Sequence, residues 1–483
     1  MDSSLVLLSL VLFYFIYHLI TKNVFTNKST PPGPFALPIL GNLLALQGPS
    51  PHLKVLELTQ KYGRVFRFWM GDQYSLFISD PDLVREVFVK NFENFSDRVP
   101  IPSYNMIGSG YRGLSSSGGS HWKSIKDILV KTFAKTSLKK AADITADETV
   151  KFIDTIKEFT KTGEPFTPRK YCQTYSMNIM LRFVFSKFLN YKDSPKDKEL
   201  IEGLIKPMDK VFVHLGAGHL GDYVKIFQPL YFFFLQFADP SIQIKKYIEK
   251  EIKEHQDTFD KENIRDILDF LLSELDSLNG DLKTVRALAQ DYLIAGSETA
   301  SGTIEWFIML MANYPETQEK AYSELINVVG KDCQYVPLEK RSATVHVNNV
   351  IKEVMRFHPI GPWGMPRSTN NEITLNSVHF PKGTQVFMHL HHMFKSEEFW
   401  DEPNEFKPER FLNSAYDSFI PFGLGSRNCI GQSLANDELY VSIANLLLNF
   451  KFERVGDELI DETELFGLTV HPNLFSVNVK SRK

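Results

Sequence analysis

The sequence predicts a mainly α-helical protein with small β-sheets, an α+β fold with one large helical domain and an N-terminal β-rich lobe. Apolar residues recur with helical periodicity through most of residues 120–360. Short patterns typical of strands occur at residues 65–70, 75–79, 374–379 and 385–390. No internal repeat and no second linker interrupts the chain, so residues 35–483 are expected to form a single domain.

The composition excludes several classes of protein. Hydrophobic residues make up 43% of the 483 residues, which is enough for a large core and argues against disorder. The 54 basic and 58 acidic residues give a net charge of −4, so no nucleic-acid partner is expected. Three cysteines exclude a disulfide scaffold and a cysteine-rich metal module, although a single cysteine can still ligate a cofactor.

The first 21 residues are predicted to form a transmembrane signal anchor. Residues 3–20 contain no charged side chain, and 18 helical residues span about 27 Å. A cleaved signal peptide, one alternative, would need a basic start and a small-residue cleavage site, whereas this chain begins Met-Asp-Ser-Ser. A buried core helix is the other alternative. Lys22 and Lys28 follow the span, which favours a cytoplasmic location for the rest of the chain.

Residues 22–34 are expected to be a basic, proline-rich hinge before the globular domain. Pro31, Pro32 and Pro34 lack backbone N–H groups and have restricted φ angles, so this segment cannot continue the helix.

A long helix is predicted over residues 283–313, where no proline occurs. At 1.5 Å per residue it measures about 46 Å. Its middle reads Ala-Gly-Ser-Glu-Thr-Ala-Ser-Gly from Ala295 to Gly302, and two glycines with a Glu-Thr pair weaken a purely structural helix. Such a departure indicates a functional site, unless the glycines only admit a neighbouring helix.

A glycine-rich turn is predicted to present Cys429 as a metal ligand. The segment Phe-Gly-Leu-Gly-Ser-Arg-Asn-Cys-Ile-Gly ends at Gly431, and an apolar helix follows over about residues 430–448. The N–H groups and positive dipole end of that helix would stabilise a thiolate, a good iron ligand. Gly431 would allow close backbone approach to a macrocycle, and Phe422 could shield the sulfur. An inert buried cysteine is the alternative.

Glu353 and Arg356 lie three residues apart on a predicted helix and therefore share a face. Arg410, in the segment Pro-Glu-Arg-Phe, could supply a second cation to the Glu353 carboxylate. The expected role of these three residues is structural.

Three further patterns carry weaker predictions. Residues 108–113 fit Gly-x-Gly-x-x-Gly, but without a preceding strand or following helix they are expected to form a loop. His389, His391 and His392 lie on a predicted strand, so His392 would point away from the other two, which disfavours a metal site. Residues 230–237, Leu-Tyr-Phe-Phe-Phe-Leu-Gln-Phe, are either a core helix or an apolar patch that dips into a membrane.

Taken together, these motifs resemble the cytochrome P-450 family, the membrane-anchored haem-thiolate monooxygenases of the microsomal type. The resemblance spans nearly the whole chain, and its most specific part is the turn that ends at Gly431. The other parts, in order, are the proline hinge at 31–34, the helix with Trp122, the motif at 295–299, Glu353-x-x-Arg356 and residues 408–411.

The resemblance implies a haem b cofactor (iron protoporphyrin IX) with Cys429 as the axial ligand of the iron. Thr299 would hydrogen-bond activated oxygen or a water beside it, and Glu298 would connect that water to solvent. Ala295 and Gly296 would lie over the haem face. The implied haem-propionate partners are Trp122, Lys126, Arg367 and Arg427, and the implied lock of the proximal side consists of Glu353, Arg356 and Arg410.

Three positions depart from the family pattern. Lys126 stands where arginine is usual, which keeps the charge and loses the bidentate fork. Ala300 replaces a second hydroxyl after Thr299, and Asn436 replaces an arginine after the cysteine. These changes would affect the propionate contact, the water network and the contact with a redox partner, respectively.

The function implied is oxidation of a lipophilic small molecule with O₂ and two electrons from NADPH-cytochrome P-450 reductase, with cytochrome b5 as a second candidate donor. The implied location is the endoplasmic reticulum membrane, single-pass, with a cytosolic catalytic domain in contact with membrane lipid. Two alternatives keep the haem: an isomerase or dehydratase of lipid hydroperoxides, and a non-catalytic haem sensor.

Overall fold

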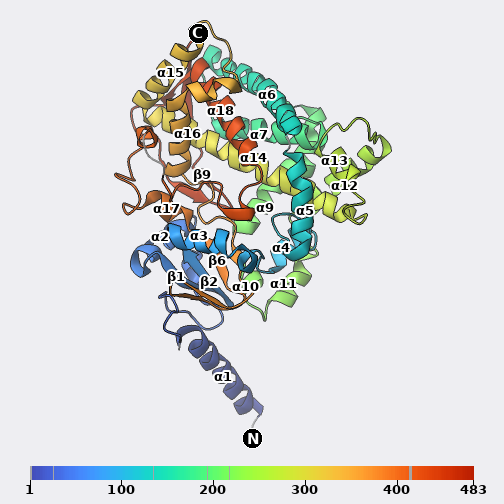
Figure 1. The fold of residues 1–483 in the computed structure, drawn as a ribbon, viewed down its shortest axis with the longest axis vertical. Coiled ribbons are helices and arrows are strands. Elements are labelled where there is room, and N and C mark those ends of the chain that lie inside the picture. The colour runs from blue at the N-terminus through green and yellow to red at the C-terminus, as the bar shows by residue number, and fades with distance from the viewer. Residues whose placement is uncertain (1–2, 26, 134, 193, 217, 413–415) are drawn as a thin grey trace.

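The computed structural model describes residues 3–483 except residues 26, 134, 193, 217 and 413–415. Helices form most of the molecule, and the largest sheet lies near the end from which the N-terminal helix projects (Figure 1). The predicted mainly α fold with small β-sheets is therefore confirmed.

The largest sheet has the strand order β1-β2-β6-β3. β1 (Val65–Met70) and β2 (Gln73–Ile78) form an antiparallel hairpin, β6 (Gln385–Met388) pairs parallel with β2, and β3 (Arg367–Ser368) pairs antiparallel with β6. Phe66 lies opposite Phe77, with the ring centroids 5.2 Å apart. The lobe predicted at the N-terminus thus also takes two strands from residues 367–388.

Two predicted strands need correction. Residues 374–379 form a hairpin of β4 (Ile373–Leu375) and β5 (Val378–Phe380), because Asn376 and Ser377 adopt positive φ angles of 46° and 64°. The strand expected at 385–390 ends at Met388, and α17 (Leu390–Lys395) follows it. Two further small sheets pair β7 (Phe450–Arg454) with β10 (Val477–Ser481) and β8 (Glu464–Phe466) with β9 (Val470–Pro472).

The remaining α-helices are α2 (Pro51–Tyr62), α3 (Pro81–Arg85), α4 (Pro102–Ile107), α5 (Gly119–Thr132), α6 (Lys135–Thr162), α7 (Pro168–Phe185), α8 (Lys198–Leu200), α9 (Lys206–Gly216), α10 (Leu220–Tyr223), α11 (Gln228–Leu235), α12 (Ile242–Asp257), α13 (Ile267–Ser273), α14 (Leu282–Asn313), α15 (Pro315–Val329), α16 (Val345–Phe357) and α18 (Gln432–Asn449). Most of them build the main core from their apolar faces, whereas α2 and α3 pack into two smaller apolar clusters beside the largest sheet.

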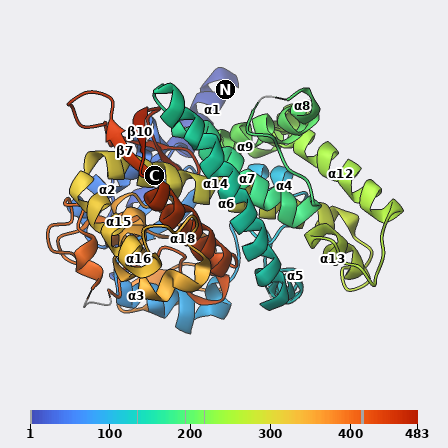
Figure 2. The same ribbon diagram turned by 90° about the horizontal axis from the view of Figure 1, so that it is seen from above.

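The long helix predicted at 283–313 is confirmed as α14 (Leu282–Asn313), which runs through the middle of the helical region (Figure 2). Asp281 caps its start by accepting a hydrogen bond of 3.0 Å from the Lys283 N–H, and Pro315 begins the next helix. α7 and α18 pack against α14. Because α14 is buried along most of its length, side chains on its middle turns can form the wall of an internal site.

The N-terminal helix α1 (Ser3–Asn23) projects from the sheet end of the molecule (Figure 1). Within the described residues it is the one helix long and apolar enough to cross a membrane, with a mean hydropathy of 2.1 over its most apolar window. Its last turn is fixed to the globular domain. The Lys22 ammonium donates to the Gly71 carbonyl at 2.8 Å and lies 3.1 Å from the Asp72 carboxylate. Lys22, predicted to follow the span in the hinge, therefore lies in the last turn of α1 and is a buried ion-pair partner.

Candidate functional site

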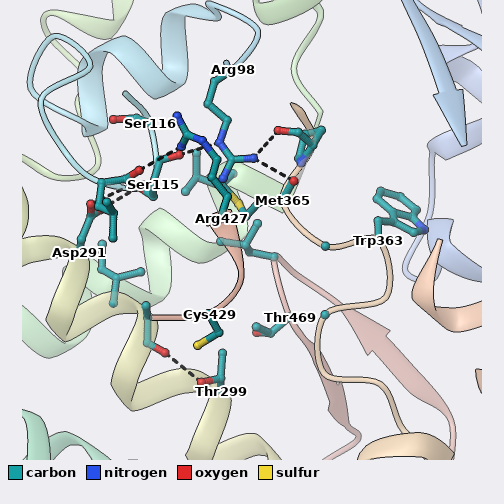
Figure 3. Close-up of a pocket in the computed structure, with 18 of the residues that line it drawn as sticks. Arg98, Ser115, Ser116, Asp291, Thr299, Trp363, Met365, Arg427, Cys429 and Thr469 are labelled. Atoms are coloured by element: carbon teal, nitrogen blue, oxygen red, sulfur yellow. Dashed lines mark hydrogen bonds between the residues drawn. The ribbon is translucent and has the colours of Figure 1, made fainter. Parts of the chain in front are cut away.

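A cavity of about 1050 Å³ lies between α14, α5 and the loop that precedes α18 (Figure 3). Its wall includes Ala295 and Thr299 of α14, Trp122 of α5 and Cys429 of the loop. Several predicted site residues, far apart in the sequence, thus meet around one space.

Cys429 is accessible from this cavity rather than packed into the core. The loop is closed by a hydrogen bond of 2.9 Å from the Cys429 N–H to the Phe422 carbonyl, so Phe422 contributes its backbone to the turn. The Gly431 N–H points at the sulfur. Phe422 and Gly431 themselves are not among the residues that line the cavity.

The surroundings of Cys429 correct one expectation. Burial among protein atoms raises the pKa of the thiol, and only the Gly431 N–H opposes this. α18 begins at Gln432, three residues after the cysteine, so the helix end does not hold a thiolate by itself. A bound metal ion would supply the charge that deprotonates the sulfur.

Positive charge gathers at another side of the cavity. Figure 3 shows the guanidinium groups of Arg98 and Arg427 beside each other. Arg427 donates to the Ser117 carbonyl at 2.6 Å and Arg98 to the Met365 carbonyl at 2.9 Å. Within the described part of the chain, neither forms an ion pair with a carboxylate at 4.0 Å or less.

Burial lowers the pKa values of both guanidinium groups. Burial and then the charges of Arg98 and Arg367 lower the pKa of Arg427 to about 8, and burial lowers the pKa of Arg98 to about 10. Since guanidinium groups keep their protons in proteins, the lowered values indicate the free-energy cost of burying these charges and, for Arg427, of placing them beside other cations. Such a cluster is suited to binding an anionic group.

Trp122 and Lys126 complete this side of the cavity. The Arg427 guanidinium lies 4.2 Å and the Lys126 ammonium 5.0 Å from the centroid of the Trp122 ring. Lys126 also donates to the Ser426 carbonyl at 2.6 Å. The lysine that replaces the usual arginine therefore reaches the loop of Cys429.

Arg367, which was predicted with Arg427 as a haem-propionate partner, is not among the residues that line the cavity. Its guanidinium donates to the Leu424 carbonyl at 2.8 Å and to the Phe88 carbonyl at 3.2 Å. It holds the start of the cysteine loop. Arg98, which lines the cavity in its place, was missed because no motif or spacing distinguishes it in the sequence.

Ala295, Gly296 and Thr299 in the middle of α14 face either the cavity or the neighbouring helix α7. Ala295 and Thr299 face the cavity, and the Thr299 hydroxyl donates to the Ala295 carbonyl at 2.9 Å (Figure 3). Gly296, predicted over the haem face, instead faces α7: a Cβ there would lie 2.1 Å from the Met180 sulfur. The packing explanation therefore holds for Gly296.

Glu298 does not line the cavity but pairs with His471, whose Nε2 lies 2.8 Å from the carboxylate. Thr469, which does line the cavity, has its hydroxyl 2.9 Å from the same Nε2 atom. No sequence pattern distinguishes His471 or Thr469, because residues 469–471 reach α14 only through the tertiary fold.

Glu353, Arg356 and Arg410 meet in the core as expected. Arg356 contacts both Glu353 oxygens at 2.8 Å, and Arg410 donates to one of them at 3.1 Å. The Lys407 N–H adds a hydrogen bond of 2.9 Å. The carboxylate is thus shared by two guanidinium groups that also bind the backbone of residues 394–405.

The weaker motifs do not form ligand sites of the kinds considered. Residues 108–113 form turns after α4, with no strand before them. Among the three neighbouring histidines, His391 donates to Glu464 at 2.9 Å while His389 contacts Thr59 at 2.9 Å. His391 and His392 lie on α17 rather than on the predicted strand, and the three rings do not converge.

The residues around the cavity fit a haem group. Cys429 offers a sulfur ligand, and the cationic groups without carboxylate partners would hold the two propionates. These cations are contributed by Arg98, Lys126 and Arg427. The apolar wall, with Trp363 and Leu468, suits the rest of the macrocycle and an apolar substrate.

Comparisons with known proteins agree with this fit. A family model described as cytochrome P450 matches residues 31–479. Two proteins of Dictyostelium discoideum, "Probable cytochrome P450 508A2" and "Probable cytochrome P450 508A1", are 35% and 36% identical, each over 99% of this chain and 99% of their own. "Probable cytochrome P450 518A1", also from Dictyostelium discoideum, is 33% identical over 100% of both chains. The chain belongs to the cytochrome P450 family of haem-binding monooxygenases.

Proposed function

We propose that this monooxygenase oxidises a lipophilic small molecule, with electrons delivered from NADPH by cytochrome P-450 reductase and cytochrome b5 as a second candidate donor. The observation that carries the proposal is the single cavity in which Cys429, the unpaired cations and an apolar wall meet. The apolar wall favours a lipophilic substrate, because polar groups buried there without partners would be penalised.

Haem supplies the activation of O₂, and the chain supplies the binding groups. Cys429 is the proposed iron ligand. Arg98, Arg427 and Lys126 would bind the propionates, with Trp122 packed beneath the Arg427 guanidinium. Arg367 would position the loop through the Leu424 carbonyl rather than bind the cofactor.

Thr299 and Glu298 are the proposed proton-handling residues. The Thr299 hydroxyl lies at the cavity wall and can donate to an oxygen atom there when it releases the Ala295 carbonyl. Glu298, one residue earlier, lies behind that wall. Ala300 is buried and does not line the cavity. The hydroxyl missing at this position therefore leaves Thr299 and Glu298 in place.

Three segments contribute side chains to the cavity wall: residues 100–114 through Tyr104, residues 212–237 through Phe212, and residues 360–366 through Trp363 and Met365. Their side chains are the proposed substrate contacts. A screen of lipophilic compounds for type-I difference spectra would identify the substrate class.

We also propose that α1 anchors the protein in the endoplasmic reticulum membrane with the catalytic domain in the cytosol. α11 supports a second membrane contact, because Leu230, Phe233 and Phe234 are each more than half exposed, as is Phe237 just beyond. The interpretation of residues 230–237 as an ordinary core helix is therefore wrong. Deleting residues 1–29 should leave residual binding to phospholipid vesicles, and additional Phe233→Ser and Phe237→Ser substitutions should abolish it. Absence of vesicle binding after the deletion alone would contradict the second contact.

The assignment of the ligand is tested by spectroscopy. Reduced protein under carbon monoxide should show the red-shifted Soret band of thiolate-ligated haem, and Cys429→His should abolish it, with Cys333→Ser as the matched control. A histidine-type spectrum in the unmodified protein would refute the ligand. Turnover of a lipid hydroperoxide without NADPH or O₂, in place of NADPH-dependent oxidation, would refute the proposed reaction.

A further inference from the structure

His471 occupies a space prepared for it on α14. Its ring lies against Gly302, where a Cβ atom would be 2.7 Å from the imidazole Cε1 and 3.0 Å from Nδ1. Any larger residue at position 302 would displace the ring. The second glycine of the long-helix motif is therefore explained by a histidine of β9, some 170 residues later in the chain.

The imidazole connects two groups that the site otherwise keeps apart. Nε2 lies 2.8 Å from the Glu298 carboxylate and 2.9 Å from the Thr469 hydroxyl. Glu298 lies behind the cavity wall, whereas Thr469 is part of it, on the same side as Thr299 and Cys429 in Figure 3. Through one nitrogen, His471 thus links the proposed proton-handling carboxylate to a hydroxyl that faces the cavity.

Charged groups from three helices surround the ring. Nδ1 lies 3.8 Å from the Glu305 carboxylate of α14, which Arg169 of α7 holds through its Nε at 3.0 Å. Asp209 of α9 lies close enough to interact electrostatically with both Glu298 and His471. The side chains of His471 and Glu298 are 16% and 15% exposed, so water reaches both only partially.

These charges keep the imidazole protonated at neutral pH. Burial alone would lower the pKa of His471, but the hydrogen bonds and charges of Glu298 and Glu305 raise it to about 9. Burial and the Glu298 charge raise the pKa of Asp209 to about 6. The group thus holds a proton on His471 and has a neighbouring carboxyl that titrates near neutral pH.

We propose that His471 is a proton-relay residue of the monooxygenase reaction, passing a proton from Nε2 to the cavity through the Thr469 hydroxyl while positioning Glu298. This inference rests on the proposed proton-handling role of Glu298 and Thr299, and it adds a second route beside Thr299.

The proton balance of this route is closed. Nε2–H breaks as Thr469 Oγ1 accepts that proton and releases its own hydroxyl proton into the cavity. His471 is then neutral with its proton on Nδ1. Glu298, a carboxylate while it pairs with the imidazolium, takes up a proton from solvent and passes it to Nε2, which restores the starting state. No electron is transferred in these steps.

Peroxide formation provides a readout that needs no identified substrate. With the holoenzyme, reductase and NADPH alone, reduction of O₂ to peroxide consumes two electrons and two protons, while reduction to two waters consumes four of each. A weakened proton supply therefore shifts the product toward hydrogen peroxide. The measured quantity is peroxide released per NADPH consumed, between pH 6.5 and pH 9.5.

We expect His471→Gln, which keeps a hydrogen-bond donor and removes the exchangeable charge, to raise this ratio about threefold or more at pH 7. The ratio of the unmodified protein should rise as the pH passes about 9, whereas that of the variant should stay flat. Thr469→Val, which leaves the histidine in place, should raise the ratio as well. An unchanged peroxide ratio and pH profile in both variants would overturn the proposal. If His471→Gln fails to fold, an unchanged ratio in Thr469→Val alone would overturn it.

His255→Gln is the matched control. His255 lies on α12 and does not line the cavity, its Nε2 lies 3.0 Å from the Asp266 carboxylate, and its pKa is also raised. It should leave the peroxide ratio unchanged.

Urea unfolding separates a relay from a merely structural residue. Because the folded pKa of His471 is raised, its stabilisation is full below about pH 6.5 and is lost as the pH rises through about 9. The difference in unfolding midpoint between the unmodified protein and His471→Gln should shrink over that range, and His255→Gln should show the same sign. If His471→Gln shifts the unfolding midpoint but leaves the ratio of peroxide to NADPH unchanged, His471 has only a structural role and the relay is refuted. Loss of the thiolate-type carbon monoxide spectrum in the unmodified protein would instead refute the proposed function.

Discussion

Two groups of arginines differ in what surrounds them. Arg356 and Arg410 share the Glu353 carboxylate, and their remaining donors bind backbone carbonyls. Arg98 and Arg427 lie beside each other and, within the described residues, have carbonyls but no carboxylate within ion-pair distance.

The two groups show how a fold can distinguish arginines that stabilise the core from arginines that bind an external anion. A buried cation with its own anion contributes to a unique core, and its partners are fully used. A buried cation without an anion raises the free energy of the empty protein, and only an external anion can offset that penalty. Substitutions in the two groups should therefore have opposite effects on the protein without cofactor.

The largest effect is expected for Glu353→Ala. It leaves two buried guanidinium groups without their carboxylate, which destabilises folding by about 3–5 kcal/mol. The free energy of unfolding from urea titration measures this. Glu319→Ala, which removes a partly exposed carboxylate 2.8 Å from Arg482, is the control and should change it by less than about 1 kcal/mol. Equal losses in the two variants would remove the distinction between the buried and the surface pair.

Arg427→Gln should weaken haem binding while leaving the cofactor-free protein at least as stable. Loss of one hydrogen bond to a charged group corresponds to about 1.5–3 kcal/mol, or roughly tenfold or more in affinity. Haem transfer to apomyoglobin measures retention, and urea unfolding measures the stability of the apoprotein. Arg112→Gln, whose arginine pairs with Asp281 at 2.7 Å, should not alter retention. A destabilised apoprotein with unchanged haem retention would place Arg427 among the structural arginines.

Glu438→Gln tests a buried carboxylate that, among the described residues, has no cationic partner. Burial raises the pKa of Glu438 to about 8, and the Ser176 hydroxyl donates to it at 2.7 Å. Because the folded pKa is raised, the unmodified protein loses stability as the pH rises from about 4.5 to about 8, and the glutamine variant does not. The variant should gain about 1 kcal/mol or more at pH 8 by urea titration. A constant difference across this pH range would contradict the raised pKa.

The smallest effect is expected for Lys126→Arg. It adds a bidentate donor to the unpaired group and should increase haem retention about two- to threefold, a change below about 1 kcal/mol. Lys123→Arg, three residues away on α5 and paired with Glu93 at 2.9 Å, is the control. Weaker retention in Lys126→Arg would mean that its contact with the Ser426 carbonyl matters more than its charge.

The sequence predicted those parts of the site that lie on local patterns. The helix through Thr299, the loop of Cys429 and the Glu353–Arg356 pair each follow from residues close together in the chain. Contacts made by distant segments were missed. Arg98 reaches the cavity from an irregular loop, and His471 reaches Glu298 from a strand near the C-terminus.

Local patterns were also overridden by turn chemistry and packing. The Asn-Ser pair at 376–377 converts one expected strand into a hairpin, because both residues adopt positive φ angles. Gly296 was expected to make room for a ligand but makes room for Met180 instead. In each case the deciding neighbour lies on another element of the fold.

The attachment of α1 through Lys22 has a mechanical consequence for the proposed anchoring in a membrane. A helix joined by a loose tether lets its catalytic domain tumble freely above the lipid, whereas one fixed at Gly71 and Asp72 transmits its tilt to the whole domain. The exposed apolar residues of α11 and Phe237 would then form a second contact with the membrane, and the two contacts together would restrict the orientation of the catalytic domain. Bilayers of different thickness would change the tilt of α1 and thereby the orientation of the catalytic domain relative to the bilayer.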